Sequence, residues 1–176
     1  TKNEAFRTVT IQGQEVSKEK YRSAKDEVSG RLTYTESKWD GGAWADETTC
    51  YESSANNTPA AGRPIFRTFA DGTAEIITYA LVNGQLKITV SRGDNSTGTL
   101  TQPVITQGTR TTTLYNVTST EISKEVHDIA SNLLLSMETG IEFDVSGRVT
   151  KKVFNANLDD HEINRYTKSR VLRQGG

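Results

Sequence analysis

Several kinds of residue that mark well-known protein classes are scarce in this chain. Cys50 is the only cysteine among 176 residues, so no disulfide can form within the chain. No apolar run approaches the roughly 18 residues that a membrane-spanning helix needs, and no signal peptide is visible. Hydrophobic residues make up only 34% of the chain. We therefore expect no disulfide-stapled fold, but a domain with a very polar surface.

Neither positive nor negative charge is in clear excess. The formal net charge is -1 and the sequence pI is about 6.1. Proteins that bind nucleic acid normally carry a basic excess that neutralises phosphates. This chain has no such excess, so we do not expect nucleic acid as a partner.

Motifs that carry known chemistry are missing too. The chain has two histidines and one cysteine. It contains no nucleophile elbow, no P-loop, no H-E-x-x-H pair and no G-x-G-x-x-G turn. We therefore expect no enzyme, no catalytic residue and no cofactor. The alternative left open is an active site on a buried carboxylate pair drawn from Glu142, Asp144 and Asp159.

What the chain does contain is a clear hairpin pattern. Asn83-Gly84 suits a type I′ turn, in which both central residues have positive φ, and β-favouring residues flank it on both sides. The strand after the turn alternates strictly, which predicts one buried face and one solvent face carrying Lys87, Thr89 and Ser91. Further strands are expected over residues 64–70, 110–120, 141–145, 149–153 and 163–173.

Two segments have helical spacing instead. Residues 14–28 are rich in Glu, Lys, Ala and Gln, with apolar residues four apart, and Gly30 follows as a helix stop. A second, short helical segment is expected over residues 122–133, after a capping box of Thr118 and Glu121. The segment between the first helix and the next loop, residues 31–39, suits either a strand or a continuation of that helix.

A long loop is expected over residues 40–64, because glycine, proline and asparagine are frequent there. Trp39, Trp44 and Tyr51 lie at or within this loop. One interpretation is that the tryptophans fasten the loop to the core. The other is that the three aromatic side chains form a ligand-binding surface, because long loops in compact domains are often functional.

A compact group of potential metal ligands lies near the end of the chain. Asp159, Asp160, His161 and Glu162 follow one another directly. Carboxylate oxygens suit a divalent cation, so Asp159, Asp160 and Glu162 are the candidate metal ligands. Adjacent residues seldom all converge on one ion, and the alternative is a solvated turn.

The predicted order is helix, long loop, β-meander, short helical segment, β-hairpin and final strand. This order indicates an α+β fold with an N-terminal helix packed on an antiparallel β-sheet. At this length the chain is predicted to form a single domain over residues 1–176, with its sheet region over 64–173.

The sheet region resembles a known family. The segment GTAEIITYALVNGQLKITVSRG, followed by QPVI, resembles a strand, turn and strand that recur in type IV minor pilins and type II secretion pseudopilins. The segment DIASNLLLSMETGIEFDVSGRVTKKVF resembles their β-sheet region, and YTKSRVLRQGG resembles their closing strand. The resemblance covers roughly residues 64–173.

The resemblance implies a soluble pilin-like ectodomain cut from a longer precursor. Residues 14–28 would then be the far end of a long N-terminal helix, and residues 40–64 the variable loop between helix and sheet. The implied function is that of a structural subunit of a type IV pilus or type II secretion filament, with an adhesive role at a tip. The implied partners are other pilin subunits and a host or surface glycan. The implied location is extracellular, at the cell surface, with a membrane contact only through the missing helix before assembly.

Two alternatives remain beside that hypothesis. The first is a surface adhesin or carbohydrate-binding β domain, which the abundant Thr, Asn and Ser residues and the three aromatic residues near the loop favour. The second is an enzyme or a phage structural protein.

Overall fold

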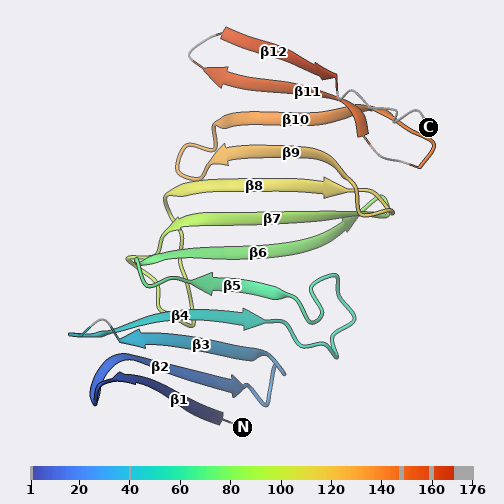
Figure 1. Ribbon diagram of the computed structural model, residues 1–176. Helices are drawn as coiled ribbons and strands as arrows, with labels where there is room; N and C mark the ends of the chain where they lie inside the picture. Colours follow the sequence, from blue (N-terminus) through green and yellow to red (C-terminus); the bar gives the residue numbers. More distant parts are fainter. Residues whose placement is uncertain (1, 40, 147–148, 159–160, 169–176) are drawn as a thin grey trace, which may run out of the picture. The chain divides into compact units, whose positions relative to one another are not determined.

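The computed structural model describes residues 2–39, 41–146, 149–158 and 161–168. Its strands hydrogen-bond in chain order, from β1 to β12, as an antiparallel meander (Figure 1). The strands are β1 (Lys2–Ile11), β2 (Gln14–Lys25), β3 (Leu32–Trp39), β4 (Trp44–Tyr51), β5 (Pro64–Thr68), β6 (Thr73–Val82), β7 (Gln85–Asp94), β8 (Gly108–Tyr115), β9 (Glu121–Asp128), β10 (Leu134–Phe143), β11 (Val149–Leu158) and β12 (His161–Lys168).

The fold is all-β, so the predicted α+β class is wrong. Across the described ranges there is no helix of any kind, and hence none long and apolar enough to cross a membrane. The pilin-like resemblance fails with it, because that family is defined by a long N-terminal helix packed on its sheet. Residues 14–28, the expected end of that helix, lie largely in strand β2.

Both predicted helices are strands for the same physical reason. β2 is hydrogen-bonded on both sides, to β1 and to β3, and β9 lies in the same way between β8 and β10. Two ladders of backbone hydrogen bonds and cross-strand contacts outweigh an intrinsic helix preference of a few tenths of a kcal/mol per residue. Gln12 and Gly13, with φ of 51° and 80°, make the tight turn that starts β2.

The remaining strand predictions are mostly confirmed. Asn83 and Gly84 have φ of 51° and 77° and form the turn of the β6–β7 hairpin, as the sequence pattern required. Of residues 31–39, the stretch Leu32–Trp39 forms strand β3 rather than a helix. The predicted contrast of faces on β7 is wrong, because its alternating residues from Gln85 to Ser91 are all half-buried.

The predicted loop over residues 40–64 is only partly a loop. Trp44–Tyr51 forms strand β4, paired along its length with β3. The irregular part therefore spans residues 52–63, and it returns the chain to β5. Backbone bonds from Glu52 N to Arg63 O (2.9 Å) and from Gly62 N to Glu52 O (3.2 Å) close its base.

Contacts divide the chain into two compact units. The first comprises residues 1–78 and 91–108, and the second comprises residues 79–90 and 109–176. In the first unit the buried apolar residues are Cys50, Ala74 and Ile77. The same unit buries three hydroxyl side chains, those of Ser37, Thr48 and Thr68.

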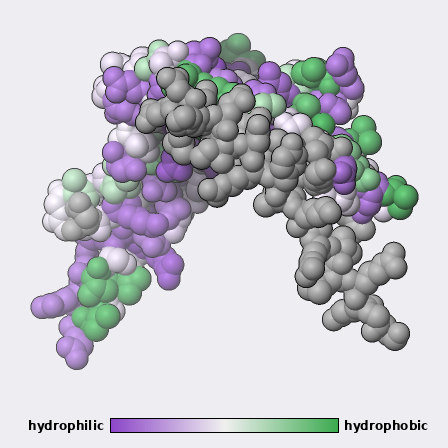
Figure 2. All heavy atoms as spheres, turned by 90° about the horizontal axis from the view of Figure 1, so that it is seen from above, coloured by the Kyte–Doolittle hydropathy of each residue, from purple (hydrophilic) through white to green (hydrophobic). Residues whose placement is uncertain are grey.

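Apolar surface is dispersed rather than concentrated. Every residue of β1 is exposed, and Phe6 reaches 68% exposure. Apolar side chains form small, separate patches among hydrophilic ones on the face shown in Figure 2. Among the side chains that the structure describes, the apolar core is therefore small, and backbone ladders and polar packing contribute much of the cohesion.

One turn recurs with the same side-chain contacts. Asp26 Oδ1 accepts hydrogen bonds from Ser29 N (2.6 Å) and Ser29 Oγ (2.8 Å), and Asp128 Oδ1 does the same with Ser131 N (2.7 Å) and Ser131 Oγ (2.6 Å). In each turn the aspartate N–H donates to the carbonyl five residues later, at 2.9 Å. The fifth residue of each turn also has positive φ, 69° and 59° respectively. The strand-turn-strand unit is thus built more than once by the same local chemistry.

Candidate functional site

Two of the three predicted aromatic ligand residues lie together. Trp39 ends β3 and Trp44 begins β4, and the two residues are paired across the hairpin. Their ring centroids are 5.5 Å apart at an interplanar angle of 59°. Both side chains are half-buried, so they pack against each other and keep part of their ring surface accessible.

The third predicted residue, Tyr51, lies elsewhere. It is the last residue of β4, seven residues beyond Trp44, which corresponds to about 23 Å along a strand. An odd separation also places the two side chains on opposite faces of the sheet. The structure therefore brings the tryptophans together and leaves Tyr51 apart from them.

The predicted metal ligands cannot be placed. Asp159 and Asp160 lie outside the described residues, and so does the side chain of Glu162 in β12. Within the part of the chain that is described, no group of three or more His, Cys, Asp and Glu side chains could hold a metal ion. Of the carboxylates considered for an enzyme, Asp144 caps a turn by accepting a hydrogen bond from Ser146 N at 2.9 Å.

A row of polar side chains that the sequence pattern does not predict lies on the tryptophan-bearing face of β2, β3 and β4. We call this surface the polar face; it comprises Lys20 and Arg22 of β2, Thr35, Ser37 and Trp39 of β3, and Trp44, Asp46 and Thr48 of β4. Cross-strand pairing sets Lys20 and Asp46 opposite Ser37, and Arg22 and Thr48 opposite Thr35. Alternation along a strand places residues two apart on the same face, so the tryptophans share this face.

An ion pair crosses the polar face. Arg22 Nη2 lies 2.8 Å from Asp46 Oδ2, and it is also 3.4 Å from Ser37 Oγ. Arg22 and Asp46 belong to β2 and β4, so this pair ties together two strands that are not neighbours. Two of its atoms, Arg22 Nε and Asp46 Oδ1, are shielded from solvent and have no hydrogen-bond partner. The pair therefore keeps one unused donor and one unused acceptor.

Hydroxyl groups form the floor beside this ion pair. Thr35 Oγ1 and Thr48 Oγ1 are 3.0 Å apart and share a hydrogen bond. Thr68 Oγ1, on the next strand, donates to the Leu100 carbonyl at 3.2 Å, which holds the loop between β7 and β8 over the sheet. Thr48 and Thr68 are buried, at 2% and 1% exposure, whereas Thr35 is half-buried and its hydroxyl keeps hydrogen-bonding capacity for a polar ligand.

The polar face contains a hollow of about 590 Å³. Its walls come from β1 to β4 and from the β7–β8 loop, and include Glu4, Arg22, Thr35, Asp46, Thr48 and Leu100. This volume falls within the range of small-molecule sites. A smaller hollow of about 250 Å³ lies against Trp39, with Val16, Lys18 and Gly41 among its walls.

Lys20 contacts both the tryptophan pair and a carboxylate of β1. Lys20 Nζ lies 5.1 Å from the centroid of the Trp44 ring, within the range of a cation–π interaction. The same ammonium group is 4.0 Å from Glu4 Oε1 on β1. These contacts fix the outer surface of Trp44 and leave Trp39 as the ring nearest the smaller hollow.

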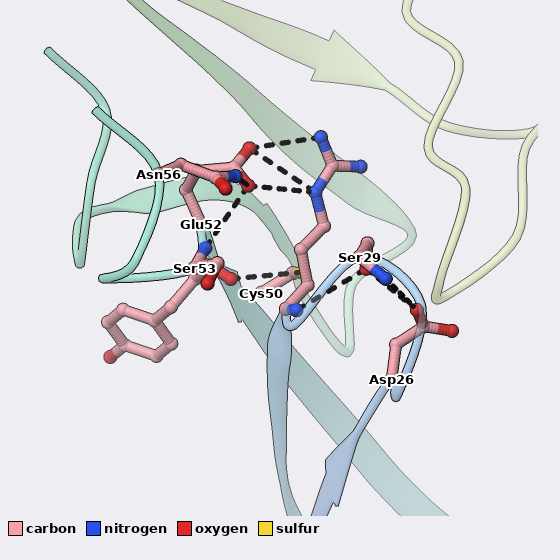
Figure 3. A network of polar contacts seen from close by, with 8 residues as sticks. Asp26, Ser29, Cys50, Glu52, Ser53 and Asn56 are labelled. Atoms are coloured by element: carbon pink, nitrogen blue, oxygen red, sulfur yellow. Dashed lines mark hydrogen bonds and ion pairs between the residues drawn. The ribbon is translucent and has the colours of Figure 1, made fainter. Parts of the chain in front are cut away.

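A second polar network anchors the loop over residues 52–63 (Figure 3). Arg31 Nη2 lies 3.0 Å from Glu52 Oε2, and Glu52 Oε1 accepts from Asn56 Nδ2 (2.8 Å) and Ser53 N (3.1 Å). Arg31 is the main cause of the lowered pKa of Glu52. Nearby, burial raises the pKa of the Cys50 thiol, which keeps this cysteine in its unreactive form. The network is structural and lies outside the polar face.

No family model, no curated protein and no solved structure matches this chain. The polar face itself combines a half-buried tryptophan pair, an ion pair with unused hydrogen-bonding atoms, and hydroxyl groups around a hollow.

Proposed function

We propose that this chain is a carbohydrate-binding β domain of the adhesive kind. The observation that carries the proposal is the juxtaposition, on one face of β2–β4, of the Trp39–Trp44 pair and a hollow walled by hydroxyl and charged side chains. An accessible aromatic ring offers a flat apolar surface for the C–H face of a sugar. Hydroxyl, guanidinium and carboxylate groups serve its hydroxyls.

The aromatic and polar parts are close enough to serve one ligand. Ser37 precedes Trp39 by two residues on β3, and Asp46 follows Trp44 by two residues on β4. Each step is about 6.6 Å along a strand. A ligand of two or three sugar rings would reach from Trp39 into the larger hollow.

The same proposal assigns the domain a binding role without catalysis and a location outside the cell, where glycans are presented. A filament role as a pilin subunit loses its support, because the helix on which that hypothesis depended is strand β2.

Screening the whole chain on a glycan array, followed by titration of each hit, tests the proposal. Trp39→Ala is expected to weaken binding about tenfold, or about 1.4 kcal/mol, because it removes the ring that lines the smaller hollow. Tyr34→Ala is the matched control: this tyrosine is 40% exposed, lies on the same strand and points to the opposite face. An array without any hit, or equal losses in both variants, would contradict the proposal.

A further inference from the structure

The charges on and beside the polar face are matched. Arg22 is paired with Asp46 at 2.8 Å, Lys20 with Glu4 at 4.0 Å, and Lys18 with Glu15. Lys2, at the rim of the larger hollow, is the further cation of this region and is exposed. An anionic ligand would meet carboxylates next to each of the three paired cations. The face therefore offers many hydrogen-bonding groups and little net positive potential.

The unused atoms of the central ion pair have complementary roles. Arg22 Nε is an N–H donor and Asp46 Oδ1 is an acceptor. A single hydroxyl accepts one bond and donates another, and two hydroxyls on adjacent carbons do so side by side. Both atoms are shielded in the unliganded chain, but the Arg22 and Asp46 side chains are 41% and 24% exposed and both line the larger hollow, so a ligand in that hollow lies against the ion pair.

From these two observations we infer that the ligand is a neutral saccharide, held at Arg22 and Asp46 through two hydroxyls on adjacent ring carbons. This inference rests on the proposed carbohydrate-binding function and names the sugar class. A uronic acid or a sulfated sugar that binds at Arg22 or Lys20 would have to displace Asp46 or Glu4 from its partner, at the cost of a charge-assisted bond. A neutral diol completes the bonds of Arg22 and Asp46 and leaves the ion pair in place.

Intrinsic fluorescence provides a direct titration, because Trp39 and Trp44 are the two tryptophans of the chain. The probes are neutral oligosaccharides, their uronate and sulfated counterparts, and neutral analogues that lack one hydroxyl of the diol. Each is titrated at low and at high salt. Neutral sugars are expected to bind with little salt dependence, and each deoxy analogue at the Arg22–Asp46 position about tenfold more weakly.

Asp46→Asn is the decisive variant. It keeps the shape and one oxygen acceptor but leaves Arg22 without a counter-charge, so the preference should shift from neutral toward anionic sugars by about tenfold. Glu47→Gln is the matched control, because this exposed neighbour on β4 lies on the opposite face and its loss changes the net charge equally.

The outcomes separate the inference from the proposed function. Salt-sensitive binding of anionic sugars by the unmodified chain, or an Asp46→Asn variant with unchanged preference, would overturn the neutral-diol inference and leave carbohydrate binding intact. A chain whose fluorescence and array signals respond to none of the sugars would overturn both.

Discussion

We expect the loss of the Glu52 side chain to destabilise the first unit. Its carboxylate accepts hydrogen bonds from Asn56 Nδ2, Ser53 N and the Arg31 guanidinium, at 2.8, 3.1 and 3.0 Å. The side chain is 12% exposed, whereas that of Arg31 is 48% exposed. In Glu52→Ala the arginine can be rehydrated, while the Ser53 N–H and the Asn56 amide each lose a charged acceptor. We expect the free energy of unfolding to fall by about 2 kcal/mol.

The effect should depend on pH with a defined sign. The pKa of Glu52 is lowered in the folded chain, first by the hydrogen bond from Arg31 and then by those from Ser53 and Asn56. A carboxylate with a lowered folded pKa stabilises the fold above its unfolded pKa, about 4.3, and this contribution is lost as pH falls through the folded value. The unmodified chain and Glu52→Ala should therefore differ most at neutral pH and converge in acid.

Urea unfolding followed by circular dichroism, at a series of pH values, measures this difference. Glu47→Ala is the control: this residue of β4 is exposed, so its removal should change stability by no more than about 0.5 kcal/mol. A difference between the unmodified chain and Glu52→Ala that stays constant from neutral to acid pH would refute the assigned role of the carboxylate charge.

Two further predictions concern the segment from the end of β7 to the start of β8. A Cβ added at Gly93 would lie 1.8 Å from the backbone oxygen of Gln107, so Gly93→Ala should force the strand ends apart and cost about 3 kcal/mol, measured as a lower urea midpoint. Asn95 Oδ1 accepts a hydrogen bond from Val104 N at 2.7 Å. Asn95→Ala should therefore speed hydrogen exchange at the Val104 amide and lower the free energy of unfolding by about 1 kcal/mol. An exchange rate equal to that of the unmodified chain would show that this bond does not hold the loop.

The sequence predicts the strands whose turns carry a strong local signal. Asn83-Gly84 was sufficient to place a hairpin, because few other residue pairs tolerate two positive φ angles in succession. The corresponding turn before β2 uses Gln12 and Gly13, and glutamine gives no comparable signal. The strand that follows it is composed of good helix formers, so local preference and final structure disagree there.

The polar face could not be predicted from the sequence, for a different reason. Arg22, Thr35 and Asp46 lie on one face of their strands, but the residues between them are also polar, as Tyr21, Ser23 and Glu36 show. With polar residues on both faces, hydropathy no longer alternates with a period of two. Only the pairing of β2 with β3 and of β3 with β4 brings these side chains together. The two tryptophans stand out in the sequence because they are rare, whereas the common polar residues beside them do not.

The order of the strands has a consequence for how the chain reaches its fold. Each strand bonds to those immediately before and after it in the chain, so every ladder closes a short stretch of polypeptide, and the entropy lost at each closure is small. Formation can start at a hairpin with a favourable turn and extend one strand at a time in either direction. Stability should accordingly be graded along the molecule, lowest at a terminal strand with a single bonded neighbour, and a shortened chain that ends at a turn should keep the ladders it still contains.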